Sequence, residues 1–205
     1  MNRLRTSLRA FAKDERGVML AEFLMLFPML VWGFIALVVY WDVFRTINVS
    51  QKAAYSISDL VSRQEVVTET FVAGLQNVLD FLTPGVAQSR MRITSLEFRE
   101  NTPEGNPTAW GDDQYILLWS RVSGGGSITP YSEAQLQSLD IRDRIPILDD
   151  RGSAIIVETW VDYTPSFDIG VLNFAPGISD QTFTQFIVTY PRRRRVCMDG
   201  TITCT

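Results

Sequence analysis

The chain has 205 residues, of which 46% are apolar and 20% charged, with a formal net charge of −4. This composition predicts a folded chain of one or at most two domains with a real core. It contains no histidine, which excludes a histidine general base, a Ser-His-Asp nucleophile and any zinc site with a histidine ligand. Two cysteines are too few for an all-cysteine zinc site, and the net negative charge argues against nucleic acid as a partner.

The N-terminus combines a basic leader with an apolar run. Residues 1–17 hold five basic residues against two acidic ones, a net charge of +3, whereas the rest of the chain carries −7. Residues 18–41 follow, with Glu22 as their only charged member. As a helix this run would be about 36 Å long at 1.5 Å per residue, enough for a hydrocarbon core of about 30 Å. It therefore predicts a transmembrane helix.

The charge asymmetry around this helix predicts its orientation. Basic residues in front of the span place the N-terminus in the cytoplasm, so that residues 42–205 lie in a periplasm-like or extracellular space. No small-residue cleavage site follows the run, so a secretory signal peptide is not predicted. Cys197 and Cys204 flank a short loop with a turn at Asp199-Gly200, and in an oxidising compartment they are expected to form a disulfide. In a reducing compartment they would be two free thiols.

Glu22 needs an explanation because a carboxylate one turn into a membrane helix costs a few kcal/mol unless it is paired. It either reaches back to the cytoplasmic interface or has a function. The surrounding residues, Gly17-Val18-Met19-Leu20-Ala21-Glu22-Phe23, resemble the G-x-x-x-x-E-[FY] processing site of type IV pilin-like proteins. With Pro28 and Gly33 following, the segment is most similar to the pseudopilins of the tight-adherence (Tad, Flp) pilus, the TadE/TadF-like group.

The resemblance implies a role for each residue of the motif. A prepilin peptidase would cut after Gly17 at the cytoplasmic face of the membrane, remove the leader 1–17 and leave Val18 as the new N-terminus. A glycine suits such a site because it has no side chain to obstruct the protease. Glu22, followed by Phe23, would pair with the terminal amine of a neighbouring subunit and so fix the register of assembly.

Residues 42–83 are expected to form extracytoplasmic amphipathic helices. The transmembrane helix is predicted to continue to about Gln64, because apolar residues recur mostly at three- and four-residue steps. This predicted apolar face consists of Phe44, Ile47, Ala54, Ile57, Leu60 and Val61. A second helix is predicted from Thr68, a suitable N-cap, to Leu82, ahead of Thr83-Pro84-Gly85.

Residues 86–205 are predicted to form a β-rich globular domain. Strands are expected at 90–99, 114–122, 154–163 and 182–190, which are rich in Ile, Val, Thr and aromatic residues. The third carries apolar groups on both faces, which is typical of a central strand. A capping box from Ser132 to Gln135 predicts a short helix over 133–139. The expected fold is α+β: a long N-terminal helix packed by its outer part on a single antiparallel sheet, in a pilin-like lollipop.

Four successive arginines, Arg192, Arg193, Arg194 and Arg195, lie near the C-terminus. Outside the membrane they could bind an anionic surface or an acidic partner subunit. Alternatively, they form a solvated extension of an edge strand that discourages aggregation. The acidic pairs at 112–113 and 149–150 lack the spacing of an EF-hand, so neither a metal site nor a cofactor is predicted.

The expected function is structural and not enzymatic: a minor pilin or pseudopilin for biogenesis of a tight-adherence pilus. Its partners would be the inner membrane, a prepilin peptidase and other pilin subunits. The alternative is a permanently anchored, single-pass sensor or binding protein of the cell envelope, which would keep its leader. A hydrolase would need a carboxylate pair in a cleft. The candidates are Asp140, Asp143, Glu158 and Asp162, but only in the sense that they are acidic.

Overall fold

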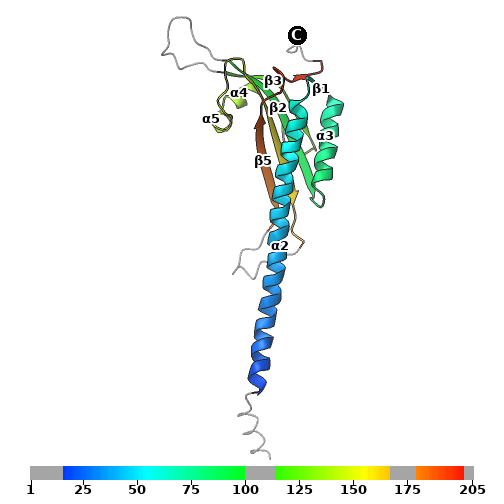
Figure 1. Cartoon of the computed structure of the whole chain (residues 1–205), viewed down its shortest axis with the longest axis vertical. Coiled ribbons are helices and arrows are strands. Elements are labelled where there is room, and N and C mark those ends of the chain that lie inside the picture. Colours follow the sequence, from blue (N-terminus) through cyan, green and yellow to red (C-terminus); the bar gives the residue numbers. More distant parts are fainter. Residues whose placement is uncertain (1–15, 100–113, 167–178, 201–205) are drawn as a thin grey trace, which may run out of the picture. The chain divides into compact units, whose positions relative to one another are not determined.

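The computed structural model describes residues 16–99, 114–166 and 179–200 (Figure 1). Its elements, in chain order, are α2 Arg16–Ser62, β1 Val66–Val67, α3 Glu69–Leu82, β2 Gln88–Arg99, β3 Gln114–Ser123, α4 Glu133–Leu136, α5 Leu139–Arg142, β4 Ser153–Tyr163, β5 Gln181–Thr189 and β6 Cys197–Met198. The fold is therefore α+β, with one long apolar N-terminal helix and a four-stranded antiparallel sheet, which confirms the expected fold class.

The chain divides into two compact units. The N-terminal unit comprises Met1–Asp42 with Pro165–Ser179, and the sheet unit comprises Val43–Thr164 with Asp180–Thr205. Helix α2 contributes to both and has 47 residues, a length of about 70 Å. It ends two residues before the predicted Gln64, and Pro28 lies inside it.

The four-stranded sheet has the strand order β3-β2-β4-β5, and every neighbouring pair is antiparallel. Strand β4 lies between β2 and β5, which confirms the prediction of a central strand at 154–163. Strand β2 is also internal. Between β2 and β3 the register shifts after Ser95, so that Ser95 faces Trp119 while Leu96 faces Leu117. Leu118 is the extra residue of this bulge.

One face of the sheet is covered by α3 and by the last turns of α2, which Figure 1 shows beside each other. Helix α3 has the predicted extent, and Thr68 caps it by accepting a hydrogen bond from the backbone N–H of Phe71 at 3.1 Å. The core on this face is formed by apolar side chains of both helices and of the sheet: Ala53, Ile57, Val61, Val67, Val72, Leu75, Leu79, Met91, Ile93, Trp119, Ile155, Val157, Val196 and Met198.

The predicted apolar face of the outer part of α2 is partly wrong. Ile57 and Val61 are buried as expected, but Phe44 and Leu60 are exposed. Ala54 is also buried, as predicted, and the buried positions include four small residues outside the predicted face: Ser50, Ala53, Ser58 and Ser62. Small side chains allow the helix backbone to approach its neighbours closely, a requirement that a search for large apolar residues overlooks.

The other face carries a second apolar cluster beneath the connection between β3 and β4. Its buried members are Leu96, Tyr115, Leu136, Ile141, Ile145, Leu148, Ala154 and Ile156. The single helix predicted over 133–139 is instead two short helices, α4 and α5. The backbone N–H of Ser132 donates to Oε1 of Gln135 at 2.9 Å, as expected for the capping box.

The prediction of a single sheet is incomplete, because β1 and β6 form a second, parallel pair. Val66 pairs with Cys197 and Val67 with Met198. Two-residue strands have no recognisable sequence pattern, so this pairing could not be seen in the sequence.

Candidate functional site

The predicted processing segment lies at the start of helix α2. Helix α2 is described from Arg16 onward, so the backbone of Gly17 and Val18 is helical, while residues 1–15 lie outside the described residues.

Glu22 and Phe23 lie one turn further along α2. Both side chains are exposed, and the rings of Phe23 and Phe27 lie 5.4 Å apart between centroids. The surrounding surface is apolar, because nearly every large side chain from Met19 to Trp41 is also exposed. By length and composition α2 could cross a membrane. An apolar surface around a whole helix is expected where the helix lies in lipid or among other helices.

The arginine run is part of a segment that joins the end of α2 to the sheet. We call residues 192–199 the C-terminal clasp. The backbone N–H of Arg192 donates to the carbonyl of Ser62 at 2.9 Å, and its guanidinium lies 3.1 Å from Asp59. Arg193 pairs with Glu65, which lies three residues beyond the end of α2. Two of the four arginines are therefore held at the end of this helix.

The second half of the clasp lies against the sheet. Arg195 pairs at 3.1 Å with Glu97 of β2, whose side chain is only 3% exposed. The carbonyl of Val196 accepts hydrogen bonds from Nε1 of Trp119 at 2.8 Å and from Oγ of Ser95 at 3.1 Å. These contacts fix the clasp over one end of the sheet. Its acidic partners were missed in the sequence because they lie more than 90 residues away along the chain.

Two further observations concern Cys197, which lies in the clasp, and Asp59, which contacts it. Cys197 is disulfide-bonded, and Cys204, its predicted partner, lies outside the described residues. Hydrogen bonds from Arg63, and secondarily from Arg192, hold the pKa of Asp59 below its usual value of 3.8, although desolvation opposes them. Asp59 is therefore ionised at neutral pH and connects α2 to the clasp.

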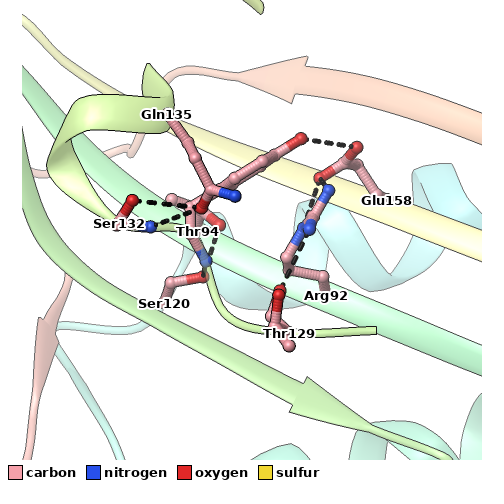
Figure 2. A network of polar contacts seen from close by, with 8 residues as sticks. Arg92, Thr94, Ser120, Thr129, Ser132, Gln135 and Glu158 are labelled. Atoms are coloured by element: carbon pink, nitrogen blue, oxygen red, sulfur yellow. Dashed lines mark hydrogen bonds and ion pairs between the residues drawn. The ribbon is translucent and has the colours of Figure 1, made fainter. Parts of the chain in front are cut away.

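A second polar cluster lies on the face of the sheet opposite α3 (Figure 2). Arg92 of β2 faces Glu158 of β4 across the ladder, and Nε of Arg92 donates to Oε2 of Glu158 at 2.7 Å. The guanidinium also donates to the carbonyl of Thr129 at 3.0 Å and lies 3.5 Å from the ring centre of Tyr131. Both charged side chains are nearly buried, with exposed fractions of 11% for Arg92 and 5% for Glu158. This cluster holds the loop after β3 against the sheet.

Tyr131 completes the cluster as a hydrogen-bond donor. Its hydroxyl donates to Oε1 of Glu158 at 3.1 Å. Burial, followed by the negative charge of Glu158, raises the pKa of Tyr131 to about 12. The phenol therefore stays protonated at any physiological pH and keeps donating to the carboxylate.

Two of the candidate acids for hydrolysis, Glu158 and Asp162, each pair with an arginine. Glu158 is bound by Arg92 and Tyr131, and Asp162 accepts from Arg90 at 2.6 and 2.8 Å. Each carboxylate thus neutralises an arginine on the neighbouring strand. Within residues 16–99, 114–166 and 179–200, no three His, Cys, Asp or Glu side chains gather as metal ligands.

Comparisons with known proteins give no further assignment: no protein-family model, no curated protein and no solved structure matches this chain.

Proposed function

We propose that this chain is a minor pilin or pseudopilin of a tight-adherence type pilus, anchored in the inner membrane by the N-terminal part of α2. Its sheet unit would lie outside the cytoplasm, and its role would be structural. The observation that carries the proposal is the exposed apolar surface of the N-terminal part of α2, which could cross a membrane and holds Glu22 five residues after Gly17.

The outer part of the molecule supports this proposal. From Val43 onward, α2 belongs to a unit built on an antiparallel sheet, and its small buried residues pack it closely there. One continuous helix that is exposed and apolar first, and packed on a sheet later, suits a subunit that is stored in a membrane and later assembled through its helix.

The proposed mechanism begins with removal of the leader after Gly17. Cleavage frees an amine on Val18, which is positively charged below a pKa of about 8. Glu22 of a neighbouring subunit then neutralises this amine in apolar surroundings, where either charge alone is costly. During assembly, the exposed apolar surface of α2 leaves the lipid and packs against the helices of other subunits. A subunit docked in the wrong register would leave both charges unpaired.

The substitution Glu22→Gln tests this mechanism in cells that carry the assembly system. It removes the charge and keeps the size of the side chain. The proposal predicts a normal amount of the protein in the membrane, but loss of its cross-links to other pilin subunits and loss of fibres. Glu69→Gln, at an exposed position of α3, is the matched control and should assemble normally. Normal assembly of Glu22→Gln would contradict the proposal and favour a permanently anchored envelope protein.

A further inference from the structure

A polar pocket of about 290 Å³ lies where the clasp meets the end of β2. Three separate segments line it: the end of β2, the turn before β4, and the clasp. The lining side chains are Glu97, Arg99, Asp150, Arg151, Arg194 and Arg195. Four arginines against two carboxylates give the pocket a formal charge of +2, in a chain whose net charge is −4.

The two carboxylates only partly neutralise these arginines. Glu97 is buried and is shared by Arg99 at 3.2 Å and Arg195 at 3.1 Å. Asp150 lies 3.9 Å from Arg151, at the outer limit for an ion pair. The side chain of Arg194 is exposed and has no ion-pair partner among the residues that the structure describes.

The backbone holds Arg151 and Arg194 in place at the pocket. Arg151 has a φ of 59°, a left-handed conformation that residues other than glycine rarely adopt. Its N–H donates to the carbonyl of Phe98 at 2.9 Å, which ties the turn to β2. The carbonyl of Arg194 accepts from Oγ of Ser153 at 2.6 Å. Hydrogen bonds therefore hold the backbone of both arginines in place. The turn would be less strained with glycine at position 151.

We propose that this pocket binds an oxyanion of the phosphate or sulfate class, held chiefly by Arg151 and Arg194, with Arg99 beside them. Guanidinium groups offer paired N–H donors that match the oxygens of such anions, and the excess of arginines over carboxylates in the lining favours a negatively charged ligand. The volume lies near the lower end of the range for small-molecule pockets, roughly 300–1,000 Å³. The ligand is a small anion or an anionic group of a larger molecule.

The site differs from the run of four arginines that the sequence suggested. Arg192 and Arg193 pair with Asp59 and Glu65 at the end of α2, and neither lines the pocket. Arg151, in contrast, comes from a turn more than 40 residues earlier in the chain. All six residues that line the pocket belong to the sheet unit, so binding there does not depend on pilus assembly.

Calorimetric titration of the full-length protein in micelles of a non-ionic, phosphate-free detergent tests this proposal. The probes are inorganic phosphate, sulfate and glycerol phosphate, a simple monoester, at constant ionic strength. We expect millimolar or tighter binding to the wild type, and a loss of about tenfold in affinity for each of Arg151→Gly and Arg194→Gln. Arg151→Gly accommodates the positive φ, so its thermal midpoint should stay unchanged or rise.

Arg193→Gln is the matched control, because it makes the same change of charge one residue away from Arg194. Its affinity should fall by less than about twofold. Binding of glycerol phosphate would indicate a ligand group carried by a larger molecule, and binding of the inorganic ions alone would indicate a free anion. Absence of binding by all three probes would overturn the proposal, as would an equal loss in Arg193→Gln and Arg194→Gln.

Discussion

Replacing Glu158 by glutamine would test whether the cluster of Arg92, Glu158 and Tyr131, on the face of the sheet opposite α3, stabilises the fold. The change leaves the guanidinium of Arg92 opposite a neutral amide, with both side chains nearly buried. Removing one partner of a buried ion pair costs about 3–5 kcal/mol. The glutamine oxygen can still accept the hydrogen bond of Tyr131, so we expect a loss at or just below the lower end of that range, about 2–3 kcal/mol.

The assay is thermal unfolding of the full chain in detergent micelles, followed by near-ultraviolet circular dichroism. For a unit of this size the expected loss lowers the midpoint by roughly 5–10 °C. Glu69→Gln is the control, because Glu69 also pairs with an arginine, Arg121 at 2.6 Å, but is 68% exposed. Exposed pairs contribute about 0–1 kcal/mol. Equal midpoint shifts in the two variants would refute the argument that burial makes the Arg92 pair important.

Two further predictions concern acid stability and a tight turn. The pKa of Asp59 is lowered in the folded chain, mainly by the hydrogen bond from Arg63. The ionised carboxylate therefore stabilises the fold fully at pH values well above 3.8, and this stabilisation is lost as the pH falls through the folded-state pKa. Urea unfolding should therefore show Asp59→Asn less stable than the wild type at neutral pH but closer to it in acid, and a constant difference would contradict this. Gly124 has a φ of +92°, and a Cβ there would lie 2.4 Å from the carbonyl oxygen of Ser89, so Gly124→Ala should destabilise the sheet unit by about 2–4 kcal/mol. Gly74→Ala is the control, since an open helical position should gain up to about 1 kcal/mol, and similar melting curves for the two variants would disprove the expected clash.

The elements that the sequence predicts correctly are those with strong local signals. Thr68 and Thr83-Pro84-Gly85 mark the two ends of α3, and the four long strands are rich in β-branched and aromatic residues. The central position of β4 follows from apolar side chains on both of its faces. In each case the information lies within about ten residues of chain.

The features that the sequence does not predict depend on contacts between distant segments. Glu158 meets Arg92 only because β2 and β4 pair in one particular register, and no local pattern fixes that register. The clasp likewise depends on Glu97, which is remote in sequence from Arg195. The pocket at Arg151 could not be predicted for the same reason, because three segments that are distant in sequence meet there.

The most direct test of the proposed function is the intact mass of the protein purified from membranes, with and without a co-expressed prepilin peptidase. We expect a peptidase-dependent loss of residues 1–17, which leaves Val18 at the N-terminus. Gly17→Leu should abolish the loss, whereas Gly33→Ala, where an added Cβ meets nothing within 4 Å, should be processed normally. A full-length chain in the presence of a peptidase that cleaves another pilin in the same cells would contradict the account.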